Sequence, residues 1–185
     1  MTRTIRILAS AGIAVAALCT NGPADARRHD AGPATGLRNI RLRAAAPDFA
    51  YDTGAGPARL SNLTGRIVVL NFWATWCEPC RDELDVLSRV RAAYGAEVEV
   101  LTISDEAPGV ARAFLLQRQL AFAVVEDPGR KIFSAYGVEP IPVTLVVGAH
   151  GIVRHVSVGQ LDWAELSSAL EEAGAGSGAA AASNR

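Results

Sequence analysis

Residues 67–80 constrain the fold and the chemistry of this chain more than any other stretch; they read Ile-Val-Val-Leu-Asn-Phe-Trp-Ala-Thr-Trp-Cys-Glu-Pro-Cys. The apolar run over residues 67–72 is typical of a strand buried on both faces, as in parallel sheets. Cys77 and Cys80 follow at the expected start of a helix, where Pro79 is tolerated because its missing amide hydrogen would have had no partner. A thiol at a helix N-terminus faces free backbone N–H groups, which favour the thiolate. The second thiol, one turn on, can attack a mixed disulfide made by the first, so the pair predicts dithiol–disulfide exchange.

The N-terminus has the pattern of a secretory signal peptide. Arg3 and Arg6 precede an apolar stretch over residues 7–19, and Ala-Asp-Ala at residues 24–26 supplies a cleavage site. A membrane-spanning helix needs about 20 apolar residues, more than this stretch has, so an uncleaved N-terminal anchor is the alternative. We therefore predict a signal peptide over residues 1–26 and export to the periplasm.

The cysteine count supports a redox role for the pair. The chain has three cysteines, and Cys19 lies in the predicted signal peptide, which leaves Cys77 and Cys80 in the mature protein. One disulfide that closes a four-residue segment hardly constrains the unfolded chain, so a structural role is poorly supported. The three histidines are not spaced for a metal site, and we predict neither a metal nor a cofactor. The net charge of −1 gives no sign of a nucleic-acid partner.

Length and hydrophobic periodicity predict one α/β domain. The 185 residues divide into the signal peptide, a flexible linker over residues 27–45, a folded domain over residues 46–173 and a disordered tail over residues 174–185. Predicted strands cover residues 67–72, 98–103, 121–125, 143–147 and 152–158, after a small hairpin at 51–60; predicted helices follow Cys80 and cover 105–119, 130–136 and 162–173. This order predicts a mixed central sheet with helices on both faces.

Several of these motifs together resemble a known family. Residues 71–81, Gly137-Val138 and residues 141–144 (Ile-Pro-Val-Thr) resemble the thioredoxin superfamily and, more narrowly, its exported TlpA/ResA/CcmG-like branch. The likeness implies a thioredoxin fold and a cis peptide bond before Pro142. In this family the proline loop faces the first cysteine, and the resemblance implies that its backbone at Ile141 pairs with an extended substrate segment by strand addition.

The resemblance also suggests roles for the residues around the cysteine pair. Cys77 is expected to be the exposed nucleophile and Cys80 the more buried resolving thiol. Glu83, one turn beyond Cys80, is a candidate acid/base if burial raises its pKa; the alternative is an exposed glutamate near a helix N-terminus. Asn71 stands where thioredoxins have a buried aspartate, so an internal proton carrier would have to be Glu83. Trp76, next to Cys77, is expected to form part of the docking surface.

Charges near the pair bear on the direction of electron transfer. Glu78 lies between the cysteines, and its carboxylate disfavours a neighbouring thiolate, which predicts a moderately reducing dithiol. We expect the substrate-binding residues to be Trp76, Glu78, Pro79, Ile141 and Pro142. Asp85 departs from the resemblance, since the branch has a proline two positions after the glutamate.

The sequence thus predicts a periplasmic thiol–disulfide oxidoreductase that reduces client proteins. The resemblance implies clients with cysteine pairs, either apocytochrome c during its maturation or a copper-site protein of an oxidase, and a membrane electron donor of thiol type. A Cu(I)-handling module that uses Cys77 and Cys80 is the alternative, because thiolates suit that ion. A peroxidase of the peroxiredoxin type is disfavoured, because the two cysteines are poised for each other on one helix.

Overall fold

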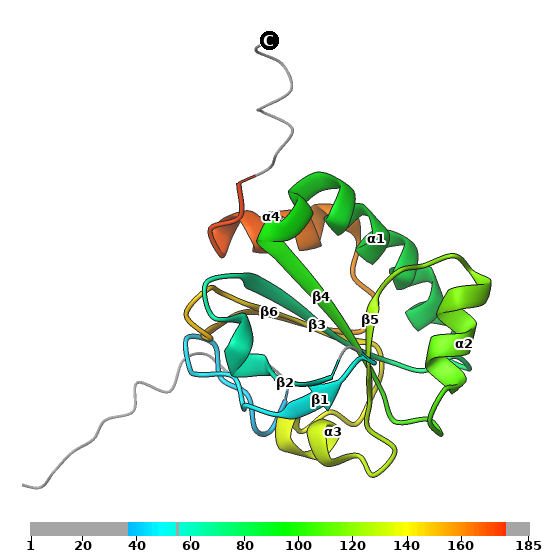
Figure 1. Cartoon of the computed structure of the whole chain (residues 1–185). Helices are drawn as coiled ribbons and strands as arrows, with labels where there is room; N and C mark the ends of the chain where they lie inside the picture. The colour runs from blue at the N-terminus through cyan, green and yellow to red at the C-terminus, as the bar shows by residue number, and fades with distance from the viewer. Residues whose placement is uncertain (1–36, 55, 177–185) are drawn as a thin grey trace, which may run out of the picture.

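The computed structural model describes residues 37–54 and 56–176 (Figure 1). The predicted signal peptide, residues 27–36 of the predicted linker and residues 177–185 of the predicted tail lie outside these ranges. Among the described helices, none is both long and apolar enough to cross a membrane.

Two sheets and four α-helices make up the described fold. In chain order the elements are β1 (Ala50–Asp52), β2 (Pro57–Arg59), η1 (Leu60–Leu63), β3 (Ile67–Trp73), α1 (Glu78–Tyr94), η2 (Gly95–Glu97), β4 (Val98–Ser104), α2 (Val110–Gln117), β5 (Ala123–Glu126), α3 (Lys131–Tyr136), β6 (Val143–Val147), β7 (Val153–Val158) and α4 (Trp163–Glu172). β1 and β2 form the predicted hairpin, and the main sheet has the order β5-β4-β3-β6-β7. β3, β4 and β5 are parallel, whereas β6 is antiparallel to β3 and β7 to β6, so the predicted mixed sheet is confirmed.

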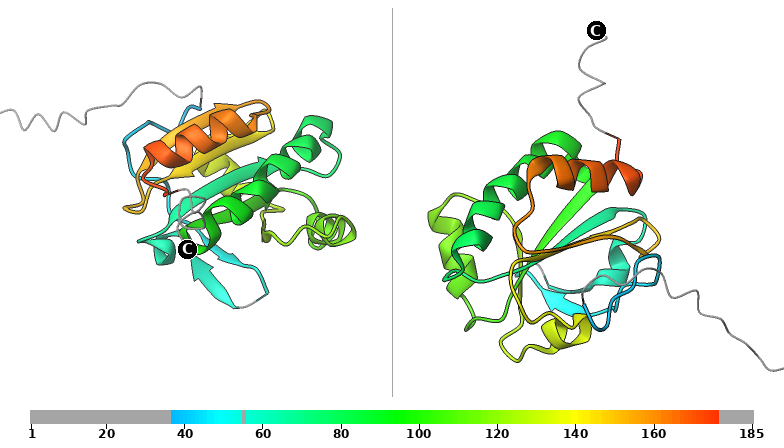
Figure 2. Two further views of the ribbon diagram at one scale, coloured as in Figure 1. Left: turned by 90° about the horizontal axis from the view of Figure 1, so that it is seen from above. Right: turned by 180° about the vertical axis from the view of Figure 1, so that it is seen from behind.

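Strand β3 is the centre of this sheet, and all seven of its residues are buried. Its unbroken apolar sequence is explained by the layers on either side of it. α1 and α4 cover one face of the sheet and α3 lies on the other, as Figures 1 and 2 show. One core cluster accordingly contains Leu84 and Leu87 of α1, and the other contains Phe133 and Tyr136 of α3. The prediction of helices on both faces is confirmed.

The helix predicted from residue 105 begins later than expected. Helix α2 starts at Val110, after Gly109 in the left-handed conformation at φ 85°. The acidic residues at 105–106 suggested a first helical turn. In the structure Glu106 instead binds the chain ahead of Cys77, so its carboxylate does not serve the N-terminus of α2.

The predicted linker is too long at its C-terminal end. Leu37 and Ile40 are buried in the cluster on the α3 face, and Ala45 bridges Ile152 beside β7. These short apolar contacts lacked a periodicity that would have marked them in the sequence. At the other end of the domain, residues 174–176 of the predicted tail are also placed: Ala175 is buried, and the Gly176 amide donates to Glu97 Oε1 at 3.0 Å.

Candidate active site

The two cysteines form a disulfide at the N-terminus of α1. Cys77 is the N-cap residue, in an extended conformation, and its Sγ accepts a hydrogen bond from the Cys80 amide at 3.3 Å. Cys77 exposes only 5% of its surface and is therefore buried, not exposed as expected, in this disulfide form; Cys80 exposes none. Cys77 is still the more accessible of the two cysteines. Because β3 delivers the chain directly to this helix start, Cys77 lies where the unpaired N–H groups of the first turn can stabilise a thiolate.

The loop before β6 closes over the first cysteine. The predicted cis peptide bond between Ile141 and Pro142 is confirmed. The carbonyl oxygen of Ile141 lies 3.9 Å from Cys77 Sγ, so this backbone borders the sulfur as expected. Pro142 is buried, and its carbonyl accepts a hydrogen bond from the Gly159 amide at 2.9 Å, which ties the loop to the end of β7.

A buried polar network lies behind the disulfide. Glu83 of α1 is fully buried, and its Oε1 accepts hydrogen bonds from the Thr144 hydroxyl and, at 3.2 Å, from Asn71 Nδ2. The Asn71 amide group also donates to Thr144 Oγ1 at 2.9 Å. Asn71 and Thr144 face each other because they are directly paired in the β3–β6 register.

The environment of Glu83 changes its acidity. Burial raises the pKa of this carboxyl to about 7, and the negative charge of Glu165 on α4 acts in the same direction, whereas the Thr144 hydrogen bond lowers it. Oε2 has no hydrogen-bond partner among the described residues. A proton bound by Glu83 therefore has a natural place on Oε2, because Oε1 already accepts two hydrogen bonds.

The remaining predicted site residues form the rim. Trp76 exposes 70% of its surface, Glu78 and Pro79 of the first helical turn are exposed, and Ile141 is half-buried. Of the predicted site residues, Glu78 and Pro79 thus lie in the first turn of α1 between the cysteines, and Ile141 borders Cys77 Sγ. Glu83 lies one turn beyond Cys80, in contact with Asn71 and Thr144. Within the described ranges, no group of three or more histidine, cysteine, aspartate or glutamate side chains is arranged to hold a metal ion.

Sequence reasoning missed two residues near the site. The motif at residues 141–144 includes Thr144 but indicates no role for it; its pairing with Asn71 places it beside Glu83 once β6 lies next to β3. The acidic pair at residues 105–106 predicts a helix start, and no signal in the sequence relates Glu106 to Thr75, its partner 31 residues away.

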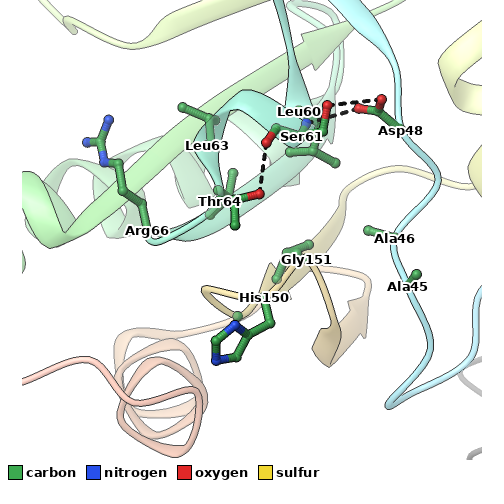
Figure 3. A pocket seen from close by; sticks show the side chains of 13 residues that line it. Ala45, Ala46, Asp48, Leu60, Ser61, Leu63, Thr64, Arg66, His150 and Gly151 are labelled. Atoms are coloured by element: carbon green, nitrogen blue, oxygen red, sulfur yellow. Dashed lines mark hydrogen bonds between the residues drawn. The ribbon is translucent and has the colours of Figure 1, made fainter.

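A separate cavity of about 210 Å³ lies at the other end of β3 (Figure 3). It is lined by residues that include Val68, Val147, Leu63 and His150, and Ser61 beside it is hydrogen-bonded to Asp48. Val68 and Val147 are paired at the end of the strands remote from the disulfide, so this cavity is no part of the redox site.

A thioredoxin-like fold with a cysteine pair at the start of α1 and a cis-proline loop against it defines a thiol–disulfide oxidoreductase. Comparisons with known proteins agree. The model of the AhpC/TSA family matches residues 42–156. The thiol-disulfide oxidoreductase ResA of Geobacillus thermodenitrificans is 30% identical over 135 residues, which are 71% of this chain and 78% of that protein.

Solved structures show the same fold. A Chlorobium tepidum protein assigned as the thiol:disulfide interchange protein DsbE superposes with a TM-score of 0.68 at 32% identity, covering 72% of this chain and 98% of that one. A secreted Mycobacterium tuberculosis disulfide oxidoreductase superposes with a TM-score of 0.58 at 26% identity, covering 66% and 94%. The chain belongs to the AhpC/TSA family, and within it to the ResA-like thiol–disulfide oxidoreductases.

Proposed function

We propose that this protein reduces disulfides in client proteins outside the cytoplasmic membrane. The observation that carries the proposal is the cysteine pair at the start of α1: Cys77 retains 5% exposure and lies against the Ile141 carbonyl, whereas Cys80 and Glu83 are fully buried behind it. The signal-peptide pattern at residues 1–26 and the likeness to a secreted oxidoreductase support a periplasmic location.

The chemistry takes two exchange steps. The Cys77 thiolate of the reduced protein attacks one sulfur of the client disulfide, forming a mixed disulfide and releasing the client's first thiolate. The Cys80 thiolate then attacks Cys77 Sγ, forms the internal disulfide seen here and releases the client's second thiolate. The client gains two electrons, and the dithiol loses them. A thiol donor in the membrane would return the protein to the dithiol form.

In this proposal Glu83 is the acid/base for Cys80. Cys80 is fully buried and must lose a proton before it can attack. With its pKa raised to about 7 by burial, the Glu83 carboxyl is present near neutral pH in both forms. The ionised form accepts the Cys80 proton, and the protonated form returns it when the disulfide is reduced again.

The rim residues would supply the docking surface for the client and favour electron transfer toward it. Trp76 is the large exposed apolar side chain nearest the disulfide in sequence, and Ile141 offers backbone for an extended client segment. Glu78, exposed between the cysteines, disfavours the thiolate by like-charge repulsion. We therefore expect a reduction potential well below the roughly −120 mV of strong periplasmic oxidants. A value near −120 mV would contradict a reductase.

Trapping would identify the client. Cys80→Ala removes the resolving thiol, so the mixed disulfide on Cys77 should accumulate in the periplasm and be isolated by a tag on this chain. Apocytochrome c and an oxidase copper-site protein are the two expected classes of client. Cys77→Ser in the same background is the control, and it should trap nothing. Adducts that persist in this control would contradict the role of Cys77.

The copper alternative would rely on the two thiolates of the reduced Cys77–Cys80 pair. Among the described residues, no group of three or more histidine, cysteine, aspartate or glutamate side chains is placed to add further ligands. Weak or sub-stoichiometric Cu(I) binding by the reduced protein, measured against a competing chelator, would dispose of that alternative.

A further inference from the structure

The chain just ahead of Cys77 is fastened to the loop between β4 and α2. Glu106 in that loop accepts two hydrogen bonds from Thr75: the backbone amide donates to Oε2 at 2.8 Å, and the hydroxyl donates to Oε1 at 2.6 Å. Ser104 Oγ, at the end of β4, donates to Oε2 as well, at 3.1 Å. A carboxylate from one loop therefore holds Thr75, the residue that precedes Trp76.

The same loop is fastened to the approach of the cis-proline loop. Asp105, next to Glu106, forms an ion pair with Arg130, whose Nη2 also donates to the Val138 carbonyl at 3.3 Å. Arg130 adopts a left-handed backbone conformation at φ 52°, which is unfavourable for a residue other than glycine. Val138 lies shortly before the cis bond at Ile141–Pro142. The β4–α2 loop thus binds Thr75 directly and is linked through Arg130 to Val138, ahead of the cis-proline loop.

We propose that Glu106 is a positioning residue that sets the Thr75–Trp76 segment against the cis-proline loop for docking of a protein disulfide. The inference rests on the proposed function, because it concerns how a client meets Trp76 and Cys77. Trp76 exposes 70% of its surface, so only a minor part of its side chain is covered by neighbouring residues. Its placement then depends on the backbone of Thr75, and that backbone is bound to Glu106.

The chemistry of the contact requires a carboxylate. Three donors, from the Thr75 amide, the Thr75 hydroxyl and Ser104, converge on the two oxygens of Glu106. An ionised carboxylate only accepts, whereas an amide would turn a donor toward one of these groups. Helix capping does not explain the residue, because α2 begins after Gly109 and no side chain caps it.

Glu106→Gln tests the inference with two substrates. Insulin serves as a protein disulfide, and a small aromatic disulfide, 5,5′-dithiobis(2-nitrobenzoate), serves as a substrate that needs no docking surface. We expect KM for insulin to rise about five- to tenfold, because a Thr75–Trp76 segment no longer held by Glu106 must be ordered when the client docks. kcat and the rate with the small disulfide should change less than about twofold.

Glu126→Gln is the matched control. Glu126 also accepts a hydrogen bond from this loop, from the Gly109 amide at 2.8 Å, and pairs with Arg112, but it has no bond to Thr75. If loosening the loop were sufficient, this variant would raise KM for insulin as much as Glu106→Gln. Equal effects of the two variants would overturn the inference.

Variants of Thr75 provide a second test that does not depend on the folding of Glu106 variants. Thr75→Val removes the hydroxyl and should raise KM for insulin about fivefold, whereas Thr75→Ser keeps it and should behave as wild type. Thr75→Val should add little in the Glu106→Gln background, because both changes break the same contact. An unchanged KM in Glu106→Gln and Thr75→Val, with wild-type turnover intact, would overturn this inference alone. Wild-type protein that reduces neither substrate would overturn the proposed function and this inference together.

Discussion

The two faces of strand β3 carry different kinds of core. Alternate side chains point to opposite sides of the sheet, so Leu70 and Phe72 face α3, whereas Asn71 and Trp73 face α1. One strand thus supplies an apolar surface to one layer and a partly polar surface to the other. The comparison shows how a single buried strand can serve both stability and chemistry.

The α3 face is packed with aromatic rings. Phe72 contacts Phe133 at 5.1 Å between ring centroids, edge to face, and Tyr136 at 5.3 Å. The Tyr136 hydroxyl donates to the Pro47 carbonyl at 2.7 Å, so its polar end is satisfied. This face buries large side chains without leaving a polar group of theirs unpaired, which is the arrangement expected of a layer that stabilises the fold.

The α1 face keeps polar atoms without partners. Asn71 Oδ1, Trp73 Nε1 and Glu83 Oε2 are buried and unpaired within the described residues. Each such group costs about 1–3 kcal/mol when it is left unsatisfied. A core built for stability alone would place apolar side chains here, so the polar network behind Cys80 is best explained by the proton chemistry proposed for Glu83.

The largest expected effect lies on the α3 face. Phe133→Ala should lower the free energy of unfolding by about 3–5 kcal/mol, because it opens a cavity in an aromatic cluster where Phe133 is 1% exposed. Urea denaturation of the oxidised protein measures the loss. Disulfide reductase activity per folded molecule should stay at the wild-type value.

Leu116→Ala is the control for this prediction. Leu116 of α2 is 77% exposed, and its truncation should change stability by less than about 0.5 kcal/mol. If Phe133→Ala strongly lowered the reductase activity per folded molecule as well as the stability, the α3 face would not serve stability alone, and the distinction between the two faces would be wrong.

Most of the fold follows from local patterns in the sequence. The apolar run of β3, the glycine after α1 and the paired apolar strands at 143–147 and 152–158 each specify their element within a short window. The sequence predicts a linker over residues 37–45 because their burial depends on isolated contacts, such as those of Ile40, with no periodicity. Contacts of this kind appear only once the sheet has been assembled.

The site was predictable where its residues share one motif. Cys77 and Cys80 lie in one short segment, and the cis bond before Pro142 follows from the family resemblance. Thr144 needed the register of β6 on β3, and Glu106 needed a contact between two loops that follow different strands. Sequence patterns indicate contacts between residues close in the chain, whereas Thr144 and Glu106 contact residues that are distant in sequence.

The second prediction concerns the buried carboxyl of the α1 face. The pKa of Glu83 is about 7 in the folded protein, against an ordinary value of 4.5. Between these values the folded protein keeps a proton that the unfolded chain has released, so folding stability falls as the pH rises from 4.5 to 7 and is constant above. The full difference amounts to about 3 kcal/mol.

Glu83→Gln should remove this pH dependence. From pH 4.5 to pH 8 the free energy of unfolding of wild type should fall by about 3 kcal/mol, whereas that of the variant should not change on this account, because glutamine does not ionise. Urea titrations of both oxidised proteins at the two pH values measure it. If Glu83 is the base for Cys80, kcat of the wild type should rise as the pH rises through about 7, and the variant should lose this step. Glu139→Gln, an exposed carboxylate paired with Arg38, should behave as wild type in both measurements. Parallel pH–stability curves for wild type and Glu83→Gln would show that the carboxyl is not held protonated by its surroundings.

The smallest expected effect concerns Thr144, the hydrogen-bond partner of the Glu83 carboxyl. Thr144→Val removes the hydroxyl that donates to Glu83 Oε1 and also removes the acceptor of one Asn71 hydrogen bond, so we expect a loss of about 1–2 kcal/mol. Because that hydroxyl lowers the pKa of Glu83, its loss should move the step in kcat to a pH above 7. Thr144→Ser keeps the hydroxyl and should leave the step in place. A step that shifts equally in both variants would mean that packing of the Thr144 methyl group, and not its hydrogen bond, tunes the carboxyl. The hydrogen bonds of the polar network would then not explain why the α1 face differs from the α3 face.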